Sequence, residues 1–340
     1  MPTIKDVAAL SGVSVSTVSI ILNGQANHRR ISAETQAKVA KAIETLNYRP
    51  NVSAKKLRSN NKEYNIGVYW AADFRTNFLA RLISGMQSQV LQYKYPVNIV
   101  ICPYKNDYLY MEKGLQNESS FHAAIIANTS PVDMKFLEKH VPRIPIVLYN
   151  RYSEHYNTVT IDNFDAGRKA ALQFISNGLT DIGLVLHRKP YLAMHLRTQG
   201  FIETCRQNGI VIPKQNIITT ENLTDESALF DGVLAAEKFL KMPHRPRAIY
   251  CDSDSLAQGM LHVLNKNQIK IPDDVAIIAI GLGSPDVNKY SNPPLTVVEI
   301  PIEKIAAECI KSIINIMEQK VEMPYHVCYD TELIIRESCK

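Results

Sequence analysis

The N-terminal residues best suited to chemistry are hydroxyl side chains at the start of a short helical pattern. Ser14 is a good helix cap, and Val15, Ser16 and Thr17 follow it directly. Hydroxyls donate and accept hydrogen bonds, and beside a methyl-bearing side chain they can read base edges in a DNA major groove. Ser16 is the best candidate for a direct base contact.

Residue patterns that would indicate catalysis are missing from the sequence. No GxSxG elbow, Walker loop or HExxH motif occurs, and Gly281 with Gly283 lacks the third glycine of a dinucleotide loop. Asp252 and Asp254 have the spacing of a metal pair, but two carboxylates without further ligands are more often helix caps. Six scattered cysteines form no CxxC pair, so we expect reduced thiols. The sequence therefore predicts neither an enzyme nor a cofactor or metal site.

The first 62 residues carry a strong positive charge, and the rest of the chain does not. Ten Lys and Arg against three Asp and Glu give this segment a net charge of +7, whereas 28 basic and 30 acidic residues leave the remainder at −2. A positive head on a nearly neutral body is the electrostatic footprint of a nucleic-acid reader. An anionic-membrane tether would show the same composition, so the motifs have to decide.

The length and composition indicate a soluble protein of more than one domain. The 340 residues are 46% hydrophobic and 21% charged, which is an ordinary globular balance. No window approaches about 18 uninterrupted apolar residues, and Met1–Ser11 does not resemble an export signal. We therefore expect a cytoplasmic protein without membrane contact.

Two short helices joined by a glycine turn are predicted near the N-terminus. Thr3 can cap the first helix, Gly12 ends it, and Ser14 caps the second. Such a pair is a helix-turn-helix. A third helix is expected from the cap Ser32 until Pro50 stops it. Residues 1–50 are thus predicted to be a DNA-binding domain, 51–63 a basic hinge linker and 64–340 the body.

The body alternates short β-rich apolar runs with helical stretches, which is the rhythm of parallel sheets with helices on both faces. The predicted fold class is therefore α/β, with two doubly wound lobes and a cleft between them. Ligands of such sheets bind at the carboxyl ends of the strands. Strands are expected at 66–70, 97–102, 123–127, 146–149, 182–186, 248–250 and 275–280, and helices at 78–91, 165–177, 226–241 and 255–268.

The sequence resembles the lactose-repressor and galactose-repressor (LacI/GalR) family of bacterial regulators over nearly its whole length. The resemblance is strongest in TIKDVAALSGVSVSTVSIILN at residues 3–23 and YRPNVSAKKLR at residues 48–58. Looser matches are Asp162 with Asn163, RTQGF from Arg197, PPLTV from Pro293 and ELIIRES from Glu332. The resemblance implies an all-α helix-turn-helix head and a two-lobed body like periplasmic binding proteins.

The function that this resemblance implies is sequence-specific DNA binding in transcription regulation. It implies a repressor of carbohydrate-uptake or catabolic genes that is gated by a small-molecule effector, such as a sugar or sugar phosphate. Two heads must meet two half-sites of a near-palindromic double-stranded operator, so a homodimer is expected. No heptad helix of the kind that joins dimers into tetramers follows ELIIRES.

Further DNA-binding residues follow from the resemblance to family positions. Ser14, Ser19, Asn23 and Ser32 match backbone contacts, which bind phosphates and fix the register, although Ser14 and Ser32 could simply cap helices. Ile20 stands where the family usually shows arginine, so a bidentate guanine contact is absent. Ile20 either meets a thymine methyl group or extends the packing of its helix.

Leu57 resembles the hinge-helix wedge of the family, which enters the minor groove and kinks the duplex. Ser53 and Ala54 occupy matching hinge positions, and Lys55 and Arg58 supply positive charge to the DNA backbone. An isolated leucine among lysines has no obvious core to join. That isolation favours the wedge over ordinary packing.

The effector pocket is predicted from the body motifs. Arg197 resembles the effector arginine of the family, because a guanidinium fork can hold two adjacent hydroxyls or a carboxylate. A surface arginine on an amphipathic helix is the alternative. Polar contacts at strand ends are expected from Asn150, Ser253 and Asp254. Pocket walls are expected from Phe78 and Leu79, and cleft positions from Trp70 and Asp73.

Two departures from the family pattern leave the effector open. The turn Gly281–Gly283 replaces a Gly-aromatic-Asp turn, so a common ligand carboxylate is missing, and Leu223 stands where relatives often place an aromatic ring. A smaller, less polar or differently oriented effector would fit these changes, as would a pocket that uses Asp73 or Asp254.

Two rival interpretations remain at this point. A phosphorylated partner protein could be the main signal for the same regulator. Alternatively, the body could be a solute receptor or a sugar-modifying enzyme with an accessory DNA-binding head. The missing export signal opposes the receptor, and the missing catalytic residues oppose the enzyme.

Leu57→Ala is expected to weaken operator binding and reduce DNA bending without unfolding the protein, because a wedge acts only at a kinked base step. Fluorescence-anisotropy titrations at fixed salt should show a larger loss of affinity on operator than on random-sequence DNA. Equal losses on both DNAs would mean that Leu57 only packs within the protein.

Overall fold

The computed structural model describes residues 4–22, 26, 29–46, 63–71, 76–116, 121–140, 142, 144–188, 191–220, 228–320 and 324–340. The chain divides into two compact units, Met1–Lys62 and Glu63–Lys340, which we call the head and the body. No single helix among these residues is long and apolar enough to cross a membrane.

The described part of the head contains three helices around a small apolar core. They are α1 (Ile4–Ser11), α2 (Val15–Leu22) and α3 (Ala33–Thr45), and Val7, Val18 and Val39 are fully buried between them. Gly12 follows α1 with a φ of +68°, a left-handed conformation that costs an L-residue about 1–2 kcal/mol. The Val13 N–H bonds back to the Ala8 carbonyl at 3.2 Å. The predicted helix-turn-helix is confirmed.

The end of the third helix differs from the prediction. The helix α3 ends at Thr45 and not at Pro50, because the N–H of its C-cap Leu46 turns back to the carbonyls of Ala42 and Glu44. This correction moves the end of the helix five residues toward the N-terminus.

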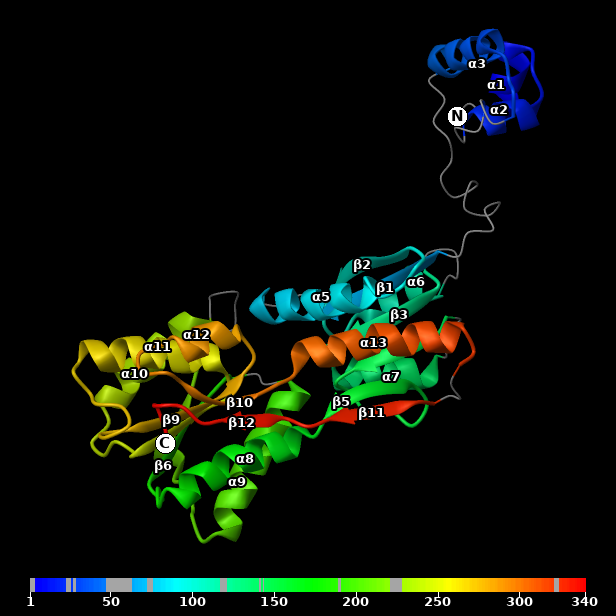
Figure 1. Ribbon diagram of the computed structural model, residues 1–340. Coiled ribbons are helices and arrows are strands. Elements are labelled where there is room, and N and C mark those ends of the chain that lie inside the picture. The colour runs from blue at the N-terminus through cyan, green and yellow to red at the C-terminus, as the bar shows by residue number, and fades with distance from the viewer. Residues whose placement is uncertain are drawn as a thin grey trace. The chain divides into compact units, whose positions relative to one another are not determined.

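The body contains two six-stranded sheets (Figure 1). Sheet A has the order β11-β5-β4-β3-β1-β2 and is parallel throughout. Its strands are β1 (Tyr64–Ala71), β2 (Val97–Tyr104), β3 (Ala123–Ala127), β4 (Ile146–Tyr149), β5 (Asn157–Ile161) and β11 (His326–Tyr329). The carboxyl ends of these parallel strands therefore share one edge of the sheet.

Sheet B has the order β12-β10-β9-β8-β6-β7, and only β12 runs antiparallel to its neighbour. Its strands are β6 (Ile182–Leu186), β7 (Ile217–Thr219), β8 (Ala248–Cys251), β9 (Ala276–Gly281), β10 (Thr296–Glu299) and β12 (Glu332–Ile334). The chain passes between the sheets after β5, after β10 and after β11, so three segments join the lobes.

Helices cover the sheets, and alternating residues of each strand face different helices. In β1, Ile66, Val68 and Trp70 share a core with α5 (Thr76–Val90) and α13 (Ile302–Met317), whereas Tyr69 and Ala71 share one with α7 (Pro131–Lys139). The remaining helices are α6 (Lys113–Gln116), α8 (Asn163–Ser176), α9 (Leu192–Gln207), α10 (Ala228–Leu240), α11 (Asp254–Lys266), α12 (Pro285–Lys289) and the 3-10 turns Leu109–Met111 and Lys214–Asn216. This arrangement confirms the α/β class.

Helices α8 and α9 pack at a pair of glycines. A Cβ atom on Gly167 would lie 1.8 Å from the Arg197 carbonyl oxygen, and one on Gly200 would lie 2.0 Å from the Phe164 carbonyl oxygen. Any larger side chain would therefore push the two backbones apart. The position of Arg197 in the body depends on this close approach.

The sequence pattern does not predict five of the strands, namely β5, β7, β10, β11 and β12. In β5, the polar residues Asn157 and Thr158 are buried, which hides the strand from a hydrophobicity pattern. The structure compensates by hydrogen bonds from Asn157 Nδ2 to the Ile146 carbonyl at 3.1 Å and between Thr158 Oγ1 and His326 Nδ1 at 2.8 Å.

Candidate functional site

The first turn of α2 presents a cluster of hydroxyls. Ser14 caps the helix, since its Oγ accepts the Thr17 N–H at 3.1 Å, and it lies 2.7 Å from Ser16 Oγ and 2.8 Å from Thr17 Oγ1. Ser14 and Ser16 are both exposed. Hydroxyls at a positive helix end are well placed to meet a phosphate or a base edge.

The other predicted DNA-binding residues differ in how far they are buried and in whether they cap a helix. Val15 is partly buried against the head core, and Ser32 caps α3 by accepting the Thr35 N–H at 3.2 Å. Ser19 and Ile20 are half-buried, and the described core cluster contains Ile21 but not Ile20. The remaining candidates lie outside the described residues; they are Asn23, Ser53, Ala54, Lys55, Leu57 and Arg58.

A pocket of about 710 Å³ opens between the lobes of the body. Sheet A contributes the segments that follow β3, β4 and β5, and the other walls come from α7 and from the N-terminal parts of α8 and α9. The lining residues are Thr129, Ser130, Pro131, Met134, Lys135, Glu138, Asn150, Arg151, Tyr152, Thr160, Ile161, Asp162, Asn163, Phe164, Leu192, Ala193 and Leu196. The volume is that of a small-molecule site.

A chain of hydrogen bonds joins this pocket to Arg197. Arg197 Nε donates to Asn163 Oδ1 at 3.0 Å, and Asn163 Nδ2 donates to Asn150 Oδ1 at 2.9 Å. Arg197 is only 3% exposed, so it is not the surface arginine of the alternative interpretation. Asn163 was visible in the sequence only as part of a motif, and the structure places its side-chain amide between Arg197 and Asn150.

The other described effector candidates do not line this pocket. Trp70 and Phe78 pack ring against ring with centroids 5.4 Å apart, and Phe78 meets Tyr149 edge-on at 5.9 Å. Leu79 is partly buried against the same core, and Ser253 caps α11 through the Leu256 N–H at 3.4 Å. Asp73 and Leu223 lie outside the described residues. Of the sequence candidates, Asn150 alone is among the residues that line the pocket described above.

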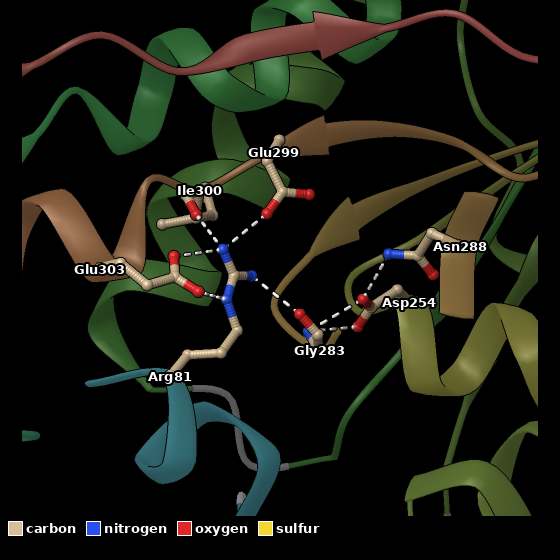
Figure 2. Close-up of polar contacts among 7 residues, drawn as sticks. All are labelled: Arg81, Asp254, Gly283, Asn288, Glu299, Ile300 and Glu303. Atoms are coloured by element: carbon tan, nitrogen blue, oxygen red, sulfur yellow. Dashed lines mark hydrogen bonds and ion pairs between the residues drawn. The ribbon is translucent and has the colours of Figure 1, made fainter. Parts of the chain in front are cut away.

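Arg81 on α5 is a central residue that the sequence did not single out (Figure 2). Its Nε and Nη2 donate to the two carboxylate oxygens of Glu303 at 2.6 and 2.7 Å. Nη1 donates to the Gly283 carbonyl at 2.8 Å, and Nη2 donates to the Ile300 carbonyl at 3.2 Å and forms an ion pair with Glu299 at 2.8 Å. Arg81 is 9% exposed. Its contacts with Gly283 and Ile300 join α5 to the other lobe of the body.

Asp254 secures that turn from the opposite side. The Gly283 N–H lies 2.8 and 3.1 Å from the two Asp254 oxygens, and Asn288 Nδ2 donates to Asp254 Oδ2 at 2.8 Å, as Figure 2 shows. Asp254 is 2% exposed, and its carboxylate holds the turn in which the family aspartate is replaced. Asp252 has a different partner, because its Oδ1 lies 2.6 Å from His187 Nδ1.

Burial and the positive charge of Arg81 have opposite effects on the pKa values of the carboxyl groups around Arg81. Burial raises the pKa of Glu299 to about 7, although Arg81 lowers it. Burial also raises the pKa of Asp254, against hydrogen bonds from Asn288 and Gly283. At Glu303 burial raises the pKa, but the hydrogen bonds that the carboxylate accepts outweigh it and the net direction is downward. Glu299 is therefore the carboxyl that takes up a proton near neutrality.

Two parts of the chain match family models. Residues 3–51 match "Bacterial regulatory proteins, lacI family", and residues 171–339 match "Periplasmic binding protein-like domain". The chain is also similar to the "HTH-type transcriptional repressor PurR" of Vibrio parahaemolyticus, with 28% identity over 350 residues that cover 100% of this chain and 99% of the relative.

Solved structures are similar in fold as well. A LacI family transcription regulator from Clostridium acetobutylicum is 42% identical and has a TM-score of 0.77, covering 81% of this chain and 100% of its own. The lac repressor dimer bound to operator and the anti-inducer ONPF is 19% identical, covers 99% of each chain and has a TM-score of 0.72.

The stability of the body should fall as the pH rises through about 7, because the folded pKa of Glu299 lies above its ordinary value of 4.5 and ionisation is unfavourable in the folded state. Glu299→Gln should flatten the melting temperature between about pH 5 and pH 8. Glu303→Gln is the contrast, since the Glu303 pKa is lowered and its loss should destabilise the protein at neutral pH. A Glu299→Gln protein that kept the wild-type pH profile would contradict this assignment.

Proposed function

Because the chain belongs to the LacI family of bacterial transcription regulators, we propose that it is an effector-gated repressor. The observation that carries the proposal is the helix-turn-helix head, in which a capped α2 exposes Ser14 and Ser16 on a unit with a net charge of +7. The relative named PurR is a repressor, and it aligns with this chain over its whole length. No part of the proposal requires catalysis.

The proposed DNA partner is a near-palindromic operator bound by a homodimer. A dimer that presents two identical heads matches two half-sites related by a two-fold axis. The lac repressor structure, which shares this fold, is a dimer on its operator. Ser16 would contact bases, and Ser14, Ser19 and Ser32 would contact phosphates.

The proposed signal is a small molecule, with a sugar or sugar phosphate as the favoured class. Support comes from the pocket between the lobes and from the hydrogen-bonded chain that links Asn150, Asn163 and Arg197. A ligand that binds one arrangement of the lobes better than another shifts the population toward that arrangement. The bonds of Arg81 to Gly283 and Ile300 are among the contacts that such a movement would alter.

Ser16→Ala in the full chain should weaken binding to the operator by about 0.5–1.5 kcal/mol, the worth of one neutral hydrogen bond, while leaving random-sequence DNA binding nearly unchanged, because a base contact supplies discrimination. Deletion of residues 1–61 should abolish both kinds of binding. Anisotropy titrations over a salt series would measure this, since phosphate contacts make log affinity fall with log salt. Operator binding by the truncated body would overturn the assignment of the head.

Arg197→Ala should remove the response to effector and leave operator binding by the ligand-free protein intact. Arg197 acts through Asn163, whose side-chain oxygen it holds, and loss of a buried charged donor costs about 2 kcal/mol or more, which we expect to appear as a roughly thirtyfold fall in effector affinity. Arg206→Ala is the matched control, because Arg206 lies on the same helix with its side chain 67% exposed and forms an ion pair with Glu203 at the surface. Calorimetry with a ligand found by thermal-shift screening would decide; unchanged affinity in Arg197→Ala would refute the role.

A further inference from the structure

We propose that the contact between the two lobes at Arg81 is a proton-linked latch, which holds the lobes together while Glu299 is protonated and releases them when Glu299 ionises. Three carboxyl groups lie around this one guanidinium, as Figure 2 shows. They belong to Asp254, Glu299 and Glu303. The latch lies in the body, so it does not depend on what the head binds and goes beyond the proposed function.

Arg81 and Glu303 belong to the same lobe. Their helices, α5 and α13, both pack on sheet A and on each other. A Cβ atom on Gly85 of α5 would lie 2.3 Å from the Glu303 carbonyl oxygen, so the two helix backbones are in contact at this point. The bonds between Arg81 and the Glu303 carboxylate therefore stay within one lobe. The contacts of Arg81 with the Gly283 carbonyl and the Glu299 carboxyl cross to the lobe of sheet B.

The Glu299 carboxyl lacks the partners that a buried carboxylate needs. Its side chain is 13% exposed, and both carboxyl oxygens are buried. Oε1 pairs with Arg81 Nη2 at 2.8 Å, but Oε2 has no hydrogen-bond donor among the described residues. Oε2 lies against Gly281 of β9, where a Cβ atom would come within 2.5 Å of it. Because a buried and incompletely paired charge is costly, the neutral carboxyl is favoured while the lobes are in contact.

Glu303 competes with Glu299 for the charge of Arg81. The Glu303 carboxylate accepts bonds from Nε and Nη2 at 2.6 and 2.7 Å, whereas Glu299 pairs with Nη2, which also donates to the Ile300 carbonyl. Ionisation of Glu299 would therefore place three carboxylates beside one cation. Burial raises the pKa of Glu299 to about 7 with a contribution from the charges of Asp254 and Glu303, although Arg81 lowers it.

Three further neighbours of this cluster come from β4, β9 and β12. Gly281 of β9 lies beside Glu299 in the sheet and has no side chain that could ionise. Glu332 of β12 lies opposite Glu299 in the register, and it is an exposed acidic residue. Tyr149 of β4 interacts with the charges of the cluster, and burial raises its pKa, so its hydroxyl stays neutral. None of these three neighbours supplies a positive charge, so Glu299 depends on Arg81.

Separation of the lobes changes the surroundings of Glu299, because the carboxyl then meets water and its pKa returns toward the ordinary value of 4.5. Since the pKa is about 7 in the latched arrangement, protonation favours that arrangement. This stabilisation is complete below about pH 4.5 and is lost as the pH rises to about 7. The ratio of released to latched molecules should therefore rise about tenfold per pH unit in this range and level off above it.

The experiment is single-molecule FRET on the full chain between about pH 5 and pH 8.5, the range in which Glu299 changes its charge. Dyes are attached at Lys139→Cys on α7 and Lys266→Cys on α11, an exposed position in each lobe. Cys102→Ser and Cys328→Ser remove the two cysteines that are not buried. An excess of unlabelled protein keeps each dye pair within one protomer.

A second population, with a different transfer efficiency, should grow as the pH rises toward about 7. Circular dichroism on the same samples should keep a constant helical signal. A transfer efficiency that does not depend on pH, or a second population that grows on acidification, would overturn the proposal. A loss of helical signal over the same range would also overturn it, because the change would then be unfolding of the body and not release of the lobes.

Three variants of the labelled protein identify the titrating group. Glu299→Gln keeps the shape but cannot ionise, so it should stay latched at every pH. Glu303→Gln removes a competing carboxylate and leaves Arg81 to Glu299, so the transition should move about one pH unit or more toward acid. Glu332→Gln makes the same chemical change at the exposed position opposite Glu299 and should leave the transition unmoved. A wild-type transition in Glu299→Gln, or an unmoved transition in Glu303→Gln, would overturn the proposal.

Discussion

The hydrogen bonds and ion pairs of one buried guanidinium, that of Arg81, hold the two lobes of the body together. Arg81 is surrounded by acceptors from three places, the turn after β9, the end of β10 and the first turn of α13, and each contact fixes the distance of α5 from one of them. Breaking one partner of a buried pair is strongly destabilising, because it leaves an uncompensated charge. Relative movement of the lobes must therefore exchange these partners together.

The pocket and the contacts of Arg81 both involve residues of the two lobes. The pocket lies where the segments after β3, β4 and β5 meet α9, and the position of α9 is fixed by its glycine contact with α8. Arg197 extends from α9 to Asn163 at the start of α8, so a ligand at Asn150 and Asn163 would act on the same helix pair. Arg81, which also pairs with Glu299, holds the turn at Gly283 through the Gly283 carbonyl.

Local signals in the sequence were enough to predict the described helices of the head and most strands of the two sheets, because caps and apolar runs act over a few residues. Ser14, Gly12 and Ser32 mark the helix ends where the structure has them. Arg81 could not be predicted, because its partners lie 202 to 222 residues away and no short spacing announces them. Asp254 was expected from family positions at the ligand, but its contacts with the Gly283 N–H appear only when the turn is seen folded. Strand β5 escaped the pattern because two of its buried side chains, Asn157 and Thr158, are polar.

The position of β11 and β12 at the C-terminal end of the sequence affects the order in which the head and the body can fold during synthesis. Strand β11 completes the edge of sheet A, and β12 pairs with β10 in sheet B. Beyond them, the Ser338 carbonyl accepts the N–H of Ile277 in β9, and the Ser338 hydroxyl donates to the Ile277 carbonyl. Neither lobe can finish its sheet before these residues have left the ribosome, whereas the described helices of the head all lie within the first 46 residues. During synthesis the sequence of the DNA-binding head is therefore complete long before that of the body. A nascent chain can carry a folded head before the body that would regulate it has folded.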